Sequence, residues 1–170
     1  MRSVASMKSY IENRVSELGS LLLSRQWTMA TAESCTGGGI SQSLTSVTGS
    51  SRWFEGGVVS YSNRVKQKLL DVPADILSRY GAVSEPVALA MAKGARKRLG
   101  VDLSVSVTGI AGPDGGSKEK PVGTVWLAWY SPKGAVAKHF VFEGERDDIR
   151  LQSVEMAIEG CFRWLEEEKN

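Results

Sequence analysis

The sequence has few of the residues from which metal sites and disulfides are built. Its 170 residues include 2 cysteines, Cys35 and Cys161, which lie far apart, and 1 histidine, His139. Separated thiols cannot form a disulfide framework or a cysteine-rich zinc site, and a single imidazole excludes every site that needs a pair. Only an all-carboxylate metal site would remain available, so we expect no metal and no cofactor. We interpret His139 as structural.

Long hydrophobic runs and a strong charge of one sign are also missing. The longest apolar runs, 21–23 and 125–130, are far too short to span a membrane, and the N-terminal residues lack the apolar core of a signal peptide. The 21 Lys and Arg residues nearly balance 19 Asp and Glu, which leaves a net charge of +2. Such a balance does not favour nucleic acid as the main partner. We expect a cytoplasmic protein in a reducing compartment, bound to neither membrane nor nucleic acid.

The remaining composition is that of a globular protein. Hydrophobic residues make up 42% of the chain and charged residues 24%, which excludes a disordered or fibrous chain. A chain of this length can bury one core. We therefore predict a single domain over residues 1–170.

Hydrophobic periodicity predicts helices that alternate with strands. Amphipathic spacing favours helices over 7–25, 37–44, 63–70, a short stretch from 73, 84–99 and 149–168. Short apolar or alternating runs favour strands over 27–34, 57–62, 102–108, 123–130 and 135–142. Because a hairpin follows the alternating part, we expect a three-layer α/β/α sandwich around a mixed sheet with an antiparallel hairpin at its edge.

Glycine-rich loops follow the first and third of these strands. Their candidate ligand-binding residues are Ser34, Thr36, Gly37, Gly38, Thr108, Gly109, Ile110 and Ala111. Ligands of such sheets bind at the carboxyl ends of strands, so we expect the loops to face each other across a crevice. The first loop could cradle an anion or simply cap the next helix. The second could donate N–H groups to an oxyanion or be an ordinary long connection.

Serine and lysine are the side chains best suited to catalysis here. With only one histidine, a lysine whose pKa is lowered by burial could serve as the base for a serine nucleophile. Ser51 with Lys66 is one such pair, although basic residues on such a helix usually lie on its solvated face, as Lys66 could here. We interpret Cys35 as a buried structural thiol. Arg150, at the start of the last helix, could reach a phosphate or remain exposed.

Several short motifs then occur in a fixed order. They are AESCTGG at 32–38, GSS at 49–51, YSN at 61–63, GAVS at 81–84, SVTGIAGP at 106–113 and KPVGTV at 120–125. In this order and spacing they resemble the CinA C-terminal domain family, the nicotinamide-nucleotide amidases. The likeness covers the chain from about Ile11 to Leu165, and it implies that the core of the domain spans about 11–165.

The resemblance implies an amidase that converts nicotinamide mononucleotide to nicotinate mononucleotide and ammonia in pyridine-nucleotide recycling. It implies a serine–lysine pair, for which Ser51 and Lys66 are the matching positions with Tyr61 close by, and Ser34 is the rival nucleophile. The first glycine-rich loop, helped by Arg150, would hold ribose or phosphate, and N–H groups near 108–111 and around Ser51 would contact the oxyanion.

Alternatives to this reaction stay open. The same pocket could belong to a nucleotide-binding or regulatory domain that performs no chemistry, or to an amidase for a different small amide. Ammonia release from nicotinamide mononucleotide would distinguish these functions. We also expect the protein to form a homo-oligomer.

Overall fold

A computed structural model describes residues 2–166 of the chain, and helices and strands alternate through most of it. The elements are α1 (Val4–Arg25), β1 (Met29–Glu33), α2 (Gly39–Leu44), the 3-10 helix η1 (Ser50–Arg52), β2 (Phe54–Val59), α3 (Asn63–Leu70), α4 (Ala74–Tyr80), α5 (Glu85–Leu99), β3 (Leu103–Gly109), β4 (Thr124–Ser131), β5 (Gly134–Val141) and α6 (Arg146–Glu166).

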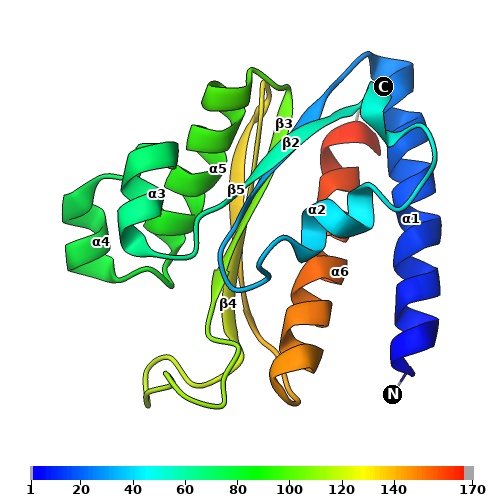
Figure 1. The fold of residues 1–170 in the computed structure, drawn as a ribbon. Coiled ribbons are helices and arrows are strands. Elements are labelled where there is room, and N and C mark those ends of the chain that lie inside the picture. Colours follow the sequence, from blue (N-terminus) through cyan, green and yellow to red (C-terminus); the bar gives the residue numbers. More distant parts are fainter. Residues whose placement is uncertain (1, 167–170) are drawn as a thin grey trace.

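The strands form one mixed sheet in the order β2-β1-β3-β4-β5. Strand β1 runs parallel to both β2 and β3, while β4 and β5 continue the sheet as an antiparallel hairpin. Helices α1, α2 and α6 cover one face, and α3, α4 and α5 cover the other (Figure 1). The predicted three-layer sandwich with a hairpin at its edge is confirmed.

Some element boundaries differ from the sequence prediction. Strand β2 begins at Phe54 rather than at 57 and ends at Val59 rather than at 62, because the next residues leave the sheet and Ser62 caps α3 by accepting a hydrogen bond from the Val65 N–H. Helix α6 begins at Arg146 rather than at 149, since the Asp148 carboxylate accepts the Glu145 N–H just before it. The predicted helix end at 168 lies outside the described residues.

Strand β3 shows how the sheet is held between its two helical layers. Val105 and Val107 are fully buried in the core that α1 and α6 also build. On the other face, the hydroxyls of Ser104 and Ser106 donate hydrogen bonds to backbone carbonyls of α5, at 2.5 and 2.6 Å. The alternation predicted from the sequence therefore separates an apolar face from a small, polar one that lets α5 approach closely.

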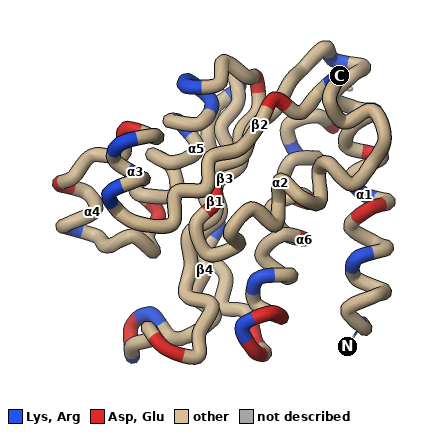
Figure 2. Tube along the Cα trace, viewed as in Figure 1, with Lys and Arg blue, Asp and Glu red and all other residues tan. Residues whose placement is uncertain are grey.

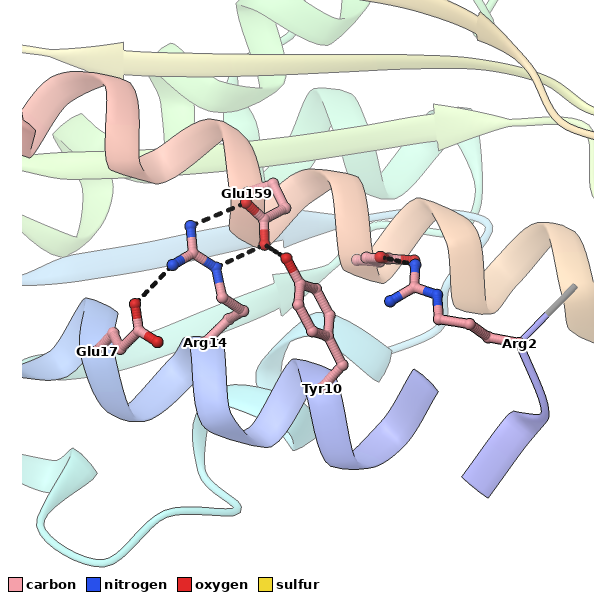
Figure 3. Close-up of polar contacts among 6 residues, drawn as sticks. Arg2, Tyr10, Arg14, Glu17 and Glu159 are labelled. Carbon is pink, nitrogen blue, oxygen red and sulfur yellow. Dashed lines mark hydrogen bonds and ion pairs between the residues drawn. The ribbon is translucent and has the colours of Figure 1, made fainter. Parts of the chain in front are cut away.

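A polar seam joins α1 to α6 at the surface (Figure 3). Arg14 donates to both carboxylate oxygens of Glu159, at 2.7 and 3.0 Å, and the Tyr10 hydroxyl donates to Glu159 at 3.0 Å. The Arg14 guanidinium also lies 3.8 Å from the ring centre of Phe162. The hydrogen bond from Arg14 lowers the pKa of Glu159, so this pairing stabilises the fold above the ordinary glutamate pKa and is lost as the pH falls below it.

Helix α5 also packs against α3, and Gly94 lies at this contact. A Cβ atom at position 94 would lie 2.0 Å from the Leu70 backbone oxygen at the end of α3. We expect Gly94→Ala to lower the free energy of unfolding by about 1–3 kcal/mol because the helices must move apart. Denaturant unfolding measures this change. Lys93→Ala, at an exposed position of the same helix, is the control, and an equally small effect of both substitutions would contradict the prediction.

Charged residues of both signs are interspersed along the chain in the view of Figure 2. None of the helices described within residues 2–166 has the length and apolar character needed to cross a membrane.

Candidate active site

The site begins where β1 ends, because successive residues of this strand face opposite sides of the sheet. Thr31 and Glu33 point toward α2, where both contact Ser41. Ala32 packs into the cluster formed with α3 and α5. Ser34 continues the alternation and points to the α3 side, where its hydroxyl lies 3.4 Å from the Tyr61 backbone oxygen. The strand therefore sends Glu33 and Ser34 to different layers of the sandwich.

Glu33 fixes the loop that follows the strand. Its fully buried carboxylate accepts hydrogen bonds from the Thr36 hydroxyl at 2.6 Å, the Ile40 N–H at 2.8 Å, and the N–H and hydroxyl of Ser41 at 3.0 and 2.8 Å. These donors occupy both carboxylate oxygens and include N–H groups at the start of α2 that have no partner within the helix. Glu33 thus ties α2 to the strand end and sets the path of the chain around Ser34.

Lys66 approaches Ser34 from α3. It lies one helical turn before the buried Leu70, so both side chains face the sheet, and Lys66 is only 1% exposed. Its Nζ atom donates hydrogen bonds to Ser34 Oγ at 3.0 Å, to the Ser60 backbone oxygen at 2.8 Å and to the Tyr61 backbone oxygen at 3.1 Å. The solvated alternative for Lys66 is excluded, since an ammonium has three donors and all find partners inside the protein.

Burial also changes the acidity of this lysine. Because removal from water disfavours the charged form, the pKa of Lys66 falls from its ordinary value to about 8. Desolvation acts in the opposite sense on the neighbouring thiol and raises the pKa of Cys35 to about 11. Near neutral pH, Lys66 can therefore release and accept protons while Cys35 stays protonated. This supports the interpretation of Cys35 as an unreactive thiol, although it adjoins the pocket.

Ser34 and Lys66 open into a pocket of about 220 Å³ at the carboxyl ends of β1 and β3. The residues that line it are Ser34, Cys35, Tyr61, Asn63, Lys66, Ala82, Val83, Thr108, Gly109, Ala111 and Arg146. The two glycine-rich loops do meet at this edge of the sheet, as expected from the parallel pairing of β1 with β3. An electrophilic carbon held at Ser34 would be in reach of both a nucleophile and a base.

The second glycine-rich loop contributes only part of what was expected of it. Thr108, Gly109 and Ala111 line the pocket, and the Thr108 hydroxyl donates to the Ala82 backbone oxygen at 2.9 Å. Ile110 is not among the lining residues, and its N–H donates to the Thr124 backbone oxygen at 2.9 Å. The Ile110 N–H is therefore engaged by the residue at the start of β4 and is not a free donor for an oxyanion, while a contact of Ile110 with substrate stays a prediction.

The first loop departs further from the expectation, since its residues after Cys35 turn away from the pocket. Thr36 and Arg150 line a separate groove of about 510 Å³ between α1, α2 and α6. Arg150 donates to the backbone oxygens of Cys35 and Thr36, at 3.2 and 3.3 Å, and pairs with Asp147 at 3.6 Å. Gly37 and Gly38 take positive φ values of 58° and 104° and shape the turn into α2. Arg150 therefore stabilises this turn through its hydrogen bonds.

The structure separates Ser51 from Lys66, so the expected pairing of these residues is corrected. Ser51 is an exposed residue of η1, which precedes β2, whereas Lys66 follows that strand. Because β2 runs parallel to β1, Ser51 lies at the amino end of the sheet and Ser34 at the carboxyl end, about 20 Å away for a strand of this length. The serine that contacts Lys66 is the rival, Ser34.

Tyr61 lies next to Ser34 and Lys66, and it contacts both through its backbone. Its carbonyl oxygen accepts hydrogen bonds from both Lys66 and Ser34. Its side chain is 62% exposed, and its hydroxyl accepts a hydrogen bond from Arg146 at 3.4 Å. The Tyr61 backbone thus helps to orient the Lys66 side chain, and a catalytic role of the Tyr61 hydroxyl stays a prediction.

Asn63, Ala82 and Val83 also line the pocket, although no role was predicted for them. All three belong to recognised motifs, which was the available signal for them. Arg146 lines the pocket as well; the sequence indicated that it, like Arg150, could reach a phosphate or remain exposed. Within residues 2–166, no His, Cys, Asp and Glu side chains gather in a group that could hold a metal ion.

Comparison with known proteins identifies relatives over most of the chain. The chain is 47% identical to the nicotinamide-nucleotide amidohydrolase PncC of Escherichia coli K12 over 144 residues, which cover 84% of this chain and 87% of that protein. It is 54% identical over 140 residues to a CinA-like protein of Parasynechococcus marenigrum, covering 81% of this chain and 33% of that protein. The chain therefore spans about a third of the longer CinA-like relative.

Solved structures show the same fold. A CinA superfamily protein from Escherichia coli superimposes with a TM-score of 0.88 at 36% identity, over 91% of this chain and 90% of its own. A competence/damage-inducible protein from Agrobacterium tumefaciens gives a TM-score of 0.88 at 40% identity, over 90% of this chain and 94% of its own. The family model described as "CinA C-terminal domain" matches residues 11–165 of this chain. From the fold, the site and these matches, the chain belongs to the CinA C-terminal domain family.

Proposed function

We propose that this protein hydrolyses the carboxamide of nicotinamide mononucleotide, with Ser34 as nucleophile and Lys66 as its base. The observation that carries the proposal is the 3.0 Å contact between Lys66 Nζ and Ser34 Oγ inside the pocket. The substrate is proposed from the relatives named nicotinamide-nucleotide amidohydrolase, of which one covers 84% of this chain. The pair supports acyl chemistry, because an amide needs a strong nucleophile and a proton for its leaving group.

The hydrogen bonds of Lys66 specify how the proton moves. In the neutral amine, the two remaining N–H groups stay on the Ser60 and Tyr61 backbone oxygens. The lone pair then faces Ser34 Oγ and takes the hydroxyl proton as Oγ bonds to the carboxamide carbon. The carbonyls that hold Lys66 thus orient it in both protonation states.

The remaining steps restore the starting protonation of Ser34 and Lys66. The Lys66 ammonium donates its new proton to the amide nitrogen, the C–N bond breaks, and ammonia leaves an ester on Ser34. Neutral Lys66 then takes a proton from water, whose oxygen attacks the ester carbon. Nicotinate mononucleotide departs as Lys66 passes the proton from water to Oγ.

Backbone N–H groups are the proposed stabilisers of the tetrahedral oxyanion. Cys35 and Ala111 both line the pocket, and we find no hydrogen bond from either backbone N–H to another residue within residues 2–166. One group adjoins the nucleophile and the other comes from the facing loop. Two donors from different loops suit an oxygen atom held between them.

The reaction is expected to depend on pH through Lys66. Its pKa of about 8 means that only about a tenth of the protein holds the neutral base at pH 7. We expect kcat/KM for nicotinamide mononucleotide to rise through pH 8 with a single ionisation and to level off above pH 9. Ammonia release measured from pH 6 to 10 tests this expectation.

The same assay tests the activity itself. Thermal stabilisation by nicotinamide mononucleotide without ammonia release would instead identify a binding domain that uses this pocket without chemistry. Ammonia release that is independent of pH over this range would keep the activity but remove Lys66 from the role of base.

A further inference from the structure

The connection between α4 and α5 forms part of the pocket wall. Ala82 and Val83 line the pocket, although residues 81–83 belong to neither a helix nor a strand. Backbone groups of an irregular segment need partners from elsewhere in the protein. Three successive carbonyls, those of Tyr80, Gly81 and Ala82, each accept a hydrogen bond from a side chain. Side chains therefore hold this part of the wall in place.

The three donors come from different parts of the chain. Ser84 donates from the start of α5 at 2.8 Å, and Thr108 donates from the end of β3 at 2.9 Å. Lys120 Nζ donates to the Tyr80 backbone oxygen at 2.8 Å, from the loop between β3 and β4. Thr108 lines the pocket, whereas Lys120 does not. Lys120 can therefore be changed without altering the lining of the pocket.

The contact between Lys120 and Tyr80 suits the end of a helix. Tyr80 is the last residue of α4, where carbonyl oxygens have no partner within the helix and a lysine can bind them. Gly81 follows with a φ of 78°, and a Cβ atom there would lie 3.3 Å from Lys120 Nζ. A glycine at this position therefore adopts the turn and leaves room for the ammonium.

The loop that carries Lys120 is itself held at several points (Figure 1). Its ends are joined where the Gly123 N–H donates to the Ile110 oxygen at 2.8 Å. Arg146 of α6 donates to a backbone oxygen of the loop at 2.7 Å. The turn at 117–120 is closed by hydrogen bonds of 2.8 and 3.0 Å between Ser117 and Lys120. Lys120 therefore ties a fixed loop to the end of α4.

We propose that Lys120 is a positioning residue of the substrate pocket. By binding the Tyr80 carbonyl, it fixes the wall that carries Ala82 and Val83 and so raises the affinity for substrate. This inference rests on the proposed amidase function. The nucleophile and its base come from the end of β1 and from α3, and hydrogen bonds that do not involve Lys120 hold both. Loss of the Lys120 contact weakens substrate binding and leaves the chemical step unchanged.

Ammonia release from nicotinamide mononucleotide tests this role. Lys120→Met removes the donor, and we expect KM to rise about 10-fold, the scale of one charge-assisted hydrogen bond, while kcat stays within about twofold. The midpoint of the pH profile should stay near 8. Lys120→Arg keeps a donor and should recover most of the affinity. Lys118→Met, at an exposed position of the same loop, should change neither constant. A lower kcat with unchanged KM, or an arginine variant no better than the methionine variant, would overturn the proposal.

Backbone order parameters of residues 81–84, measured by NMR without substrate, test the positioning independently of turnover. We expect them to fall from about 0.85, the value of a rigid backbone, toward about 0.6 in Lys120→Met and to stay unchanged in Lys118→Met. A fall confined to 117–120, or none, rejects the role even if KM rises, since Lys120 would then act on the substrate directly. If the wild type releases no ammonia, the amidase function fails, and the order parameters still decide whether Lys120 positions the wall.

Discussion

Ser34→Ala is expected to abolish ammonia release, with a fall in kcat of about 10⁴-fold or more, the scale on which serine hydrolases lose activity without their nucleophile. The reason is the position of the Ser34 hydroxyl, 3.0 Å from Lys66 Nζ. The fold should survive, because the side chain lies at the pocket wall and its removal leaves only a small space. Steady-state kinetics together with a thermal melt would show loss of turnover in a folded protein.

Ser51→Ala is the matched control. It removes the same hydroxyl from an exposed position at the other end of the sheet and should leave kcat within about twofold of the wild type, as surface substitutions remote from a site usually do. An inactive Ser51→Ala protein beside an active Ser34→Ala protein would reverse the roles and reinstate the pairing expected from the sequence.

Lys66→Arg is expected to reduce kcat by about 10³-fold or more although it keeps a positive charge. A guanidinium does not release its proton in this pH range, so it cannot accept one from Ser34. Its planar fork also differs from the arrangement in which Nζ contacts the Ser60 and Tyr61 oxygens. Activity should be assayed from pH 6 to 10, and an active arginine variant would mean that only the charge at this position matters.

Lys66→Met provides a second measurement that does not depend on turnover. The folded-state pKa of Lys66 is about 8, below the value near 10.4 of an unfolded lysine. Between these values the unfolded chain binds one more proton, so raising the pH stabilises the folded wild type by up to about 1.4 kcal/mol per pH unit relative to Lys66→Met. Unfolding of both proteins at pH 8, 9 and 10 would show the difference, and parallel curves would indicate a lysine with an ordinary pKa.

The fold and the general place of the site could be predicted from the sequence because both follow from periodicity. Alternating residues in β3 and the amphipathic helices define the layers, and parallel strands bring their carboxyl ends to one edge. The same rule predicts that a residue which precedes a parallel strand, as Ser51 does, lies at the opposite edge of the sheet. The motif likeness instead indicated a pairing of Ser51 with Lys66, and the structure agrees with the strand topology.

The chemistry of Lys66 and Arg146 was less accessible to sequence reasoning. A lysine between Arg64 and Lys68 has the pattern of a solvated face, and only the packing of α3 against α5 shows that it is buried. Arg146 and Arg150 are indistinguishable by type and spacing. What separates them is the identity of the oxygens around each guanidinium, which depends on how α6 meets loops distant in sequence.

The alternation at the end of β1 makes the strand register part of the proposed catalytic site. Glu33 pairs with Val59 on one side and Val107 on the other. A slip by one residue would exchange the faces of successive side chains, bringing the Glu33 carboxylate toward Lys66 and turning the Ser34 hydroxyl toward α2. Lys66 would then be held as a charged partner of a buried acid, unable to accept a proton. The hydrogen bonds that hold Glu33 on the α2 side therefore protect the site from inhibiting itself.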